Sequence, residues 1–132
     1  LERYPSLLER RKEIIGRYNE MCDSLGVAYL NHYGESHSSS GHLYITRIPG
    51  INEEARNSII TEMAERGIAC NVHYKPLPMM TAYKNLGWDV ADFPNAYEFF
   101  KNEITLPLHT KLSDDDVKTV CEIFSEVVKK HI

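Results

Sequence analysis

The chain has 132 residues, a length typical of one domain, and 42% of them are apolar. Its 15 basic and 19 acidic residues give a formal net charge of −4, too small and too mixed to indicate a nucleic-acid-binding protein. No apolar run approaches the roughly 20 residues that cross a bilayer, and no secretory pattern opens the chain, so membrane and secreted classes are not predicted.

The three cysteines, Cys22, Cys70 and Cys121, lie far apart among apolar neighbours. An odd number of scattered cysteines favours reduced, buried thiols and a cytoplasmic protein over a disulfide framework. The chain enters a helical pattern almost at once and has no initiator methionine. We therefore expect a piece of a longer protein, although a processed small protein would start in the same way.

Residues 4–25 form the longest predicted helix. Apolar residues recur at intervals of three and four along it, while the opposite face carries mixed charges, and Gly26 supplies a stop signal. The basic run at residues 10–12 is interrupted by glutamates and so fits a solvated helix face. A short strand is predicted at residues 27–30.

A polar, mobile loop is predicted for residues 31–41. Its surroundings contain His32, His37 and His42, which raise the question of a metal site. Their spacing of five residues fits neither a helical pair nor a zinc finger, and no cysteine or carboxylate cluster accompanies them. A metal site is therefore not predicted.

The middle of the chain predicts a strand, a helix and a second strand. The first strand covers residues 42–48, with apolar side chains on both faces. Asn52 is the expected N-cap of the helix, which ends at Gly67. Residues 68–74 alternate as a half-buried strand with a polar second face, and the prolines at 76 and 78 prevent its continuation.

The remaining elements are short helices at residues 79–86 and 94–101, a strand at 103–106, and a final helix. Ser113 and Asp116 predict a capping box at the start of that helix. Long helices with three or four short strands indicate one α+β domain over residues 1–132, with a small, largely antiparallel sheet flanked by helices. A parallel crossover through residues 42–74 is the alternative topology.

The end of the 68–74 strand carries the best candidates for chemistry, His73 and Tyr74. Histidine titrates near neutrality, and tyrosine offers a hydroxyl on a rigid apolar ring. At a strand end that runs into a proline turn, both side chains can border one cleft and bind a polar ligand. The pattern also fits a surface histidine beside a core-packing tyrosine, the commoner arrangement in proteins. Cys70 points to the opposite face from His73, so a cysteine–histidine nucleophile pair is not predicted.

His109, which follows Leu106-Pro107-Leu108, is a further candidate for the same cleft, with a solvated loop histidine as its default interpretation. Phosphate-binding glycine loops, serine-hydrolase elbows and zinc-protease motifs are all missing from the sequence.

The order of several short motifs along the chain resembles that of a known family. They are Arg11, Tyr18-Asn19, His42-Leu43-Tyr44, Gly67-Ile68, His73-Tyr74-x-Pro76, Tyr83, Pro94-Asn95-Ala96, Leu106-Pro107-Leu108-His109 and Leu112-Ser113. Together they resemble the C-terminal small domain of the DegT/DnrJ/EryC1/StrS family of pyridoxal-phosphate (PLP)-dependent nucleotide-sugar aminotransferases. The resemblance covers essentially the whole chain.

The resemblance implies a fold type I aminotransferase whose large PLP-binding N-terminal domain is absent here. It implies that the parent enzyme transfers an amino group, usually from glutamate, to a nucleotide-linked keto-sugar and forms a homodimer. It places His73 and Tyr74 in the substrate pocket and no catalytic, cofactor-binding or metal-binding residue in this chain. The piece alone is expected to bind no PLP and to be inactive.

Two positions depart from the family pattern. Pro78 stands where many members have a second histidine, and Thr110 replaces a common proline. The sugar, the position that is aminated and the possibility of a diverged reaction stay open. A stand-alone ligand- or partner-binding module of the same fold is the alternative to an enzyme fragment.

Overall fold

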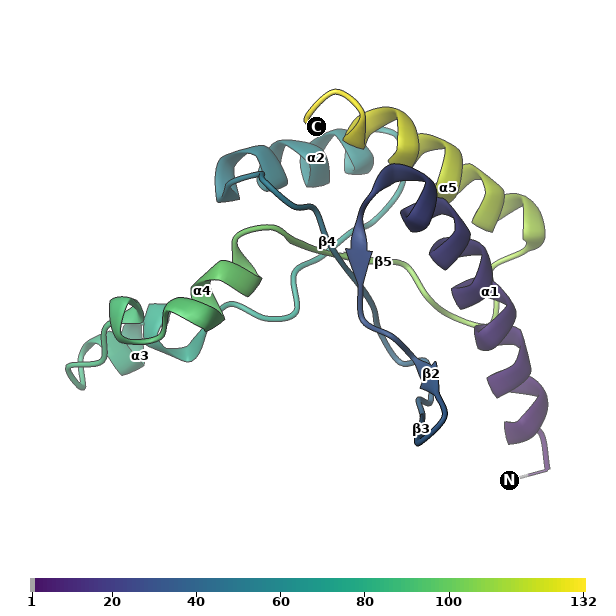
Figure 1. The fold of residues 1–132 in the computed structure, drawn as a ribbon, viewed down its shortest axis with the longest axis horizontal. Helices are drawn as coiled ribbons and strands as arrows, with labels where there is room; N and C mark the ends of the chain where they lie inside the picture. Colours follow the sequence, from purple (N-terminus) through teal and green to yellow (C-terminus); the bar gives the residue numbers. More distant parts are fainter. Residues whose placement is uncertain (1) are drawn as a thin grey trace.

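Three long helices cover one face of a small antiparallel sheet in the computed structural model, which describes residues 2–132. The long helices are α1 (Tyr4–Leu25), α2 (Glu53–Glu65) and α5 (Asp114–Val128), and the shorter ones are α3 (Thr81–Lys84) and α4 (Pro94–Phe100). The strands are β1 (Ala28–Tyr29), β2 (Tyr33–Gly34), β3 (His37–Ser38), β4 (Tyr44–Arg47) and β5 (Glu103–Leu106). Figure 1 shows α1, α2 and α5 above and beside the sheet, with α3 and α4 extending away from it. The predicted α+β architecture is confirmed.

The main sheet has the order β1–β4–β5, and both of its strand pairs are antiparallel. Tyr44 pairs with Leu106 and Arg47 with Glu103 across the β4–β5 pair. A single antiparallel bridge between Asn71 and Thr105 follows on the other side of β5. β4 and the segment around Asn71 therefore run in the same direction but are separated by β5, so no adjacent parallel pair forms in the described chain.

The prediction of a regular strand at residues 68–74 is wrong except at Asn71. The side chain of Asn71 accepts the N–H of Val72 at 2.8 Å, and a glutamate side chain, Glu103, accepts the N–H of His73 at 2.9 Å. These side chains take the place of the backbone carbonyls that a regular ladder would use, so the pairing stops after one residue.

The hydrophobic core lies between the sheet and the three long helices. On β4 the buried residues alternate, with Tyr44 and Thr46 facing the helices. The ring of Tyr44 lies 5.0 Å from that of Tyr18 on α1, at a tilt of 59°. Strand β5 adds Ile104 and Leu106, and α5 adds an apolar face that includes Phe124.

The predicted helix ends are confirmed by their hydrogen bonds. The side chain of Asn52 accepts the N–H of Ala55, and Ser113 and Asp116 form the reciprocal capping box. Gly26 ends α1 with a φ of 68°, a left-handed conformation that glycine adopts without a steric cost.

The segment at residues 31–41 is more ordered than the sequence predicts. Strands β2 and β3 pair as a hairpin, with Tyr33 opposite Ser38. His32, predicted to lie in a mobile polar loop, is buried and stacks on Tyr44 at 5.8 Å with an interplanar angle of 9°. The prediction is wrong for His32 because composition does not reveal that an aromatic core residue lies beneath it.

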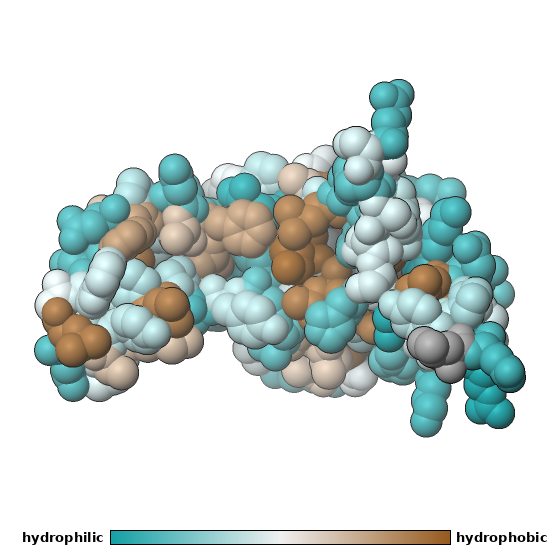
Figure 2. Space-filling model, turned by 90° about the horizontal axis from the view of Figure 1, so that it is seen from below, coloured by the Kyte–Doolittle hydropathy of each residue, from teal (hydrophilic) through white to brown (hydrophobic). Residues whose placement is uncertain are grey.

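Residues 77–97, which we call the arm, project away from the core (Figure 1). Two single-turn 3₁₀ helices, Leu77–Met79 and Val90–Asp92, precede α3 and α4 respectively. Several large apolar side chains of the arm are exposed: Leu77, Met80, Tyr83, Leu86 and Trp88. Figure 2 shows this apolar surface on the arm, seen from below.

We expect replacement of Ile104 by alanine to lower the free energy of unfolding by about 2–5 kcal/mol, because its side chain is fully buried in the core. Urea denaturation followed by circular dichroism measures the loss. Ile132→Ala is the matched control, since that side chain is 60% exposed, and its free energy of unfolding should stay within about 0.5 kcal/mol of the wild type. Equal losses in both variants would contradict the placement of the core.

Candidate functional site

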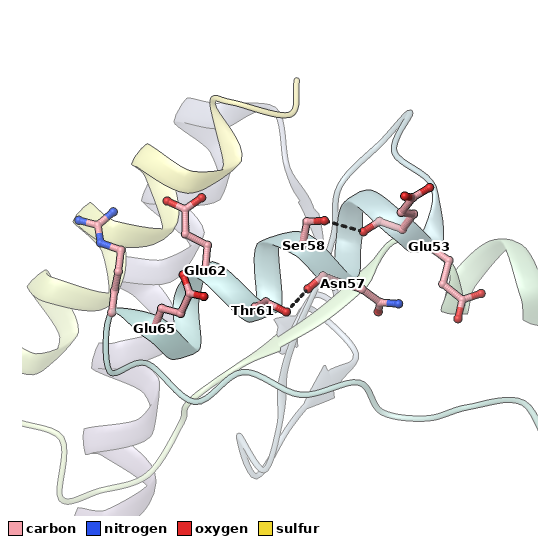
Figure 3. A pocket seen from close by; sticks show the side chains of 8 residues that line it. Glu53, Asn57, Ser58, Thr61, Glu62 and Glu65 are labelled. Atoms are coloured by element: carbon pink, nitrogen blue, oxygen red, sulfur yellow. Dashed lines mark hydrogen bonds between the residues drawn. The ribbon is translucent and has the colours of Figure 1, made fainter.

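A wide, shallow hollow of about 800 Å³ runs along α2 (Figure 3). It is lined by Glu53, Glu54, Asn57, Ser58, Thr61, Glu62, Glu65 and Arg66. The hydroxyls of Ser58 and Thr61 donate to helix carbonyls four residues earlier, at 3.1 and 3.0 Å. The side chains in Figure 3 spread along one helix and do not converge on a point, so this hollow is a solvated helix face.

A smaller hollow of about 170 Å³ lies beside His73, at the edge of β5. Its lining comes from the residues just before β4, the 68–74 segment, and the end of β5 with the residues that follow it: His42, Leu43, Ala69, Asn71, His73, Thr105, Leu106, Pro107 and Leu108. The structure thus brings one predicted site residue, His73, into a concave surface built by three separate segments.

A chain of hydrogen bonds runs from His73 into β5. The ring Nδ1 of His73 lies 3.0 Å from the Thr105 hydroxyl. That hydroxyl donates to Oε1 of Glu103 at 2.5 Å, and the backbone N–H of His73 donates to Oε2 of the same carboxylate at 2.9 Å. Both oxygens of Glu103 therefore accept hydrogen bonds, and the position of His73 is fixed at its backbone and at its ring.

Glu103 is fully buried. Burial raises the pKa of its carboxyl group, because the charged form loses water. The hydrogen bonds from the Thr105 hydroxyl and the backbone N–H of His73, and the charge of Arg56, act in the opposite direction. Both carboxyl oxygens of Glu103 accept a hydrogen bond, from the Thr105 hydroxyl and from the backbone N–H of His73, and this is the arrangement of a buried carboxylate.

Arg56 of α2 is a buried cation, 1% exposed, whose charge acts on the Glu103 carboxyl group. Its guanidinium donates to the carbonyl oxygens of Phe100 and Glu103, at 3.1 and 3.4 Å, and lies 4.6 Å from the centre of the Phe100 ring. Glu53 lies 3.6 Å away as an ion-pair partner. Arg56 thereby ties α2 to the end of α4 and to the start of β5.

Tyr74 points away from the core and is 70% exposed. The peptide bond between His73 and Tyr74 is cis, and their rings meet edge to face at 4.6 Å. The two predicted site residues therefore lie side by side. The alternative of a tyrosine packed in the core is wrong, because the chain leaves the sheet at this point.

His109 lies at a different place from His73. It borders a separate hollow of about 300 Å³, together with Gly67, Asp116 and others, and its side chain is exposed. The structure therefore fits the default interpretation of His109 as a solvated loop residue.

The other reactive side chains have environments that suppress reactivity. Burial raises the pKa of the Cys22 and Cys70 thiols to about 12 and that of Cys121 to about 11, so all three are neutral at pH 7. Within residues 2–132, no group of three histidine, cysteine or acidic side chains is arranged to hold a metal ion. Over the same residues, no helix is long and apolar enough to cross a bilayer.

Comparison with known proteins now decides the family. The sequence pattern of the DegT/DnrJ/EryC1/StrS aminotransferase family matches residues 1–125. The chain belongs to this family. The resemblance drawn from the short motifs is confirmed.

Several relatives of the chain are named as sugar aminotransferases. The Streptococcus pneumoniae protein Spr1654, named as a sugar aminotransferase and solved in its PLP form, is 56% identical with a TM-score of 0.96, over all of this chain and 34% of that one. The spore coat polysaccharide biosynthesis protein SpsC of Bacillus subtilis is 32% identical, over 98% of this chain and 34% of its own length. The dTDP-4-dehydro-2,3,6-trideoxy-D-glucose 4-aminotransferase of Saccharopolyspora spinosa is 30% identical, over 100% of this chain and 33% of its own length. The chain thus spans about a third of the length of these relatives.

The residues present do not fit PLP. A PLP enzyme holds its cofactor through a lysine in a pocket, and the lysines here are exposed or half-exposed. None of them lines the hollows beside His73, beside His109 or along α2. Lys101 and Lys130 are instead paired with Glu98 and Glu62.

Sequence reasoning missed Glu103, Thr105 and Arg56. A signal for Arg56 existed, because it shares the inward face of α2 with Ile59 and Met63 at helical spacing. The burial of Glu103 carries no such signal, since a charged residue that opens a strand is usually solvated.

We expect the stability of the chain to depend on the charge of Glu103. A carboxyl group whose native pKa is raised binds its proton more tightly in the folded state, so its contribution to stability is fully present below the unfolded value, about 4.3, and is lost as pH rises through the native pKa. The free energy of unfolding of the wild type, minus that of Glu103→Gln, should therefore increase as pH falls from 7 toward 4.5. Urea denaturation at several pH values measures this difference in the free energy of unfolding. A difference that stays constant or decreases as pH falls would show that burial does not dominate the pKa shift of Glu103.

Proposed function

We propose that this chain is the C-terminal small domain of a longer, PLP-dependent sugar aminotransferase. The parent enzyme transfers an amino group, from glutamate by the family resemblance, to a nucleotide-linked keto-sugar, and it forms a homodimer. The observation that carries the proposal is the match of the whole chain to one third of sugar aminotransferases such as Spr1654.

The positions of the lysines support the assignment of cofactor binding to a larger domain and of substrate binding to this chain. Since no lysine lines the hollows described above, the cofactor and the bond-making groups belong to the larger domain. PLP would supply the electron sink for amino transfer there. This chain would contribute a rigid wall that binds and orients the sugar nucleotide and excludes water from it.

The arm gives independent support for further polypeptide in the parent protein. Leu86 is 74% exposed, Leu77 53% and Trp88 50%. An apolar cleft of about 310 Å³ is lined by six residues of the arm, Leu77, Pro78, Tyr83, Trp88, Phe93 and Ala96, and by the preceding Pro76. Exposed apolar surface of this kind marks a contact site, and the larger domain is the polypeptide that we propose to cover it.

His73 and Tyr74 are the residues we assign to the substrate wall. His73 is held at its backbone and at Nδ1, and this pre-organisation reduces the entropy lost on binding. The Tyr74 ring rests edge-on against His73 and is mostly exposed. Both can therefore contact a ligand without rearrangement of the core.

A stand-alone binding module is the second candidate function, because the described residues contain no PLP site. The coding sequence upstream of Leu1 separates the two. A larger domain with the family's lysine in the same reading frame supports the enzyme. A start codon at this point, with no such domain, supports the module and overturns the proposed enzyme fragment.

We expect the isolated 132-residue chain to show no saturable binding of PLP, because no pocket lysine is available to it. Isothermal titration calorimetry with PLP measures this, and the full-length protein is the matched positive control. One-to-one binding with micromolar affinity by the isolated chain would contradict the assignment of cofactor binding to a larger domain.

In the full-length protein, we expect His73→Ala and Tyr74→Phe to raise KM for the nucleotide sugar about tenfold, equivalent to the loss of roughly one good hydrogen bond. Their thermal unfolding should change little, because Tyr74 is exposed and His73 lies at the edge of the sheet. His37→Ala, in the exposed hairpin, is the matched control and should leave KM unchanged. If both site variants keep the KM of the wild type, then neither His73 nor Tyr74 binds the substrate.

A further inference from the structure

The hydrogen-bond chain from Glu103 to His73 has a defined direction. The Glu103 carboxylate has two acceptor oxygens and no proton to donate. The Thr105 hydroxyl therefore donates its single proton in the hydrogen bond to Oε1 of Glu103. The Thr105 oxygen can then only accept from the ring of His73. Nδ1 of His73, 3.0 Å from that oxygen, must carry a proton.

We propose that Glu103 and Thr105 are positioning residues that hold His73 in the Nδ1–H tautomer, so that its Nε2 presents a hydrogen-bond acceptor to a hydroxyl of the bound sugar. This inference rests on the proposed function for the identity of the ligand. The direction of the hydrogen-bond chain stands without it.

The free nitrogen is placed to meet a ligand. Over residues 2–132, His73 has ring hydrogen bonds only through Nδ1, and its Nε2 is not among the buried atoms that lack a partner. His73 also lines the hollow at the edge of β5, with His42 and Asn71. A neutral ring with an acceptor nitrogen at this position binds donors such as sugar hydroxyls and does not favour the acceptor oxygens of a diphosphate.

The charged groups around Glu103 do not change the direction of the hydrogen bonds from Glu103 to His73. Burial raises the pKa of the Glu103 carboxyl group, and the charge of Arg56 on α2 opposes that shift. Arg47 of β4 is paired with Glu103 across the sheet, but its guanidinium binds Asn102 and the carbonyl of Glu98. Lys75, the next charged residue along the chain, is exposed.

Replacement of Glu103 by glutamine should reverse the donor and acceptor roles along the hydrogen bonds from residue 103 to His73. The backbone N–H of His73 can only donate, so it fixes the amide oxygen of glutamine on its side. The amide NH₂ then faces Thr105 and donates to its hydroxyl oxygen. The Thr105 proton is released to donate to Nδ1 of His73, and the ring proton must move to Nε2.

Nitrogen-15 NMR of histidine-labelled 132-residue chain at pH about 8.5, where histidine rings are neutral, reports the tautomer directly. The spectrum of His73→Ala identifies the peaks of His73. We expect the Nδ1–H form in the wild type and in Thr105→Ser, which keeps the hydroxyl, and the Nε2–H form in Glu103→Gln. Thr105→Val should lose the preference for Nδ1–H. An Nε2–H ring in the wild type, or an unchanged ring in Glu103→Gln, would overturn the proposal.

Kinetics of the full-length protein test the link to the ligand. We expect Glu103→Gln and Thr105→Val to raise KM for the nucleotide sugar about tenfold while kcat changes less, and Thr105→Ser to restore the wild-type KM. Tautomers as expected with unchanged KM would overturn the ligand role of Nε2 and leave the proposed function intact. Absence of transamination by the wild type with every nucleotide sugar tested would contradict the proposed function and leave the tautomer result standing.

Discussion

The burial of β5 on both faces is the constraint on which the rest of the structure depends. Ile104 and Leu106 point into the core under the three long helices. Glu103 and Thr105 point the other way and are nevertheless buried. A buried carboxylate needs donors, and they come from the 68–74 segment and from Thr105 itself. The hydrogen bonds that the buried Glu103 carboxylate accepts therefore fix the position of His73.

The same constraint explains why the 68–74 segment is not a regular strand. Its Asn71 pairs once with Thr105, and the next backbone donors are directed to the side chains of Asn71 and Glu103. The chain then leaves the sheet, which exposes Tyr74 and turns its ring against His73. A ladder interrupted by side-chain acceptors thus produces a preformed, polar edge, and this edge is where we propose that a substrate binds.

Local patterns predicted the parts of the fold that local energetics govern. The capping box at Ser113, the Asn52 cap and the strand at residues 103–106 follow from short-range hydrogen bonds and from apolar alternation. The prediction for residues 68–74 was wrong because alternation describes side chains only, whereas strand pairing depends on where backbone donors go. His32 was misplaced for a similar reason, since its burial comes from a stacking partner twelve residues away, Tyr44.

The sequence by itself determined the family, the α+β class and the two candidate residues of the site, because motif order, helical periodicity and the positions of the prolines can all be read along the chain. Only the tertiary structure decided that Glu103, Thr105 and His73 form one hydrogen-bonded chain. Glu103 and His73 are thirty residues apart, and a charged residue in a sequence does not reveal whether it is solvated or buried. That choice depends on the packing of α2, β5 and the 68–74 segment around it, which is a property of the folded chain as a whole.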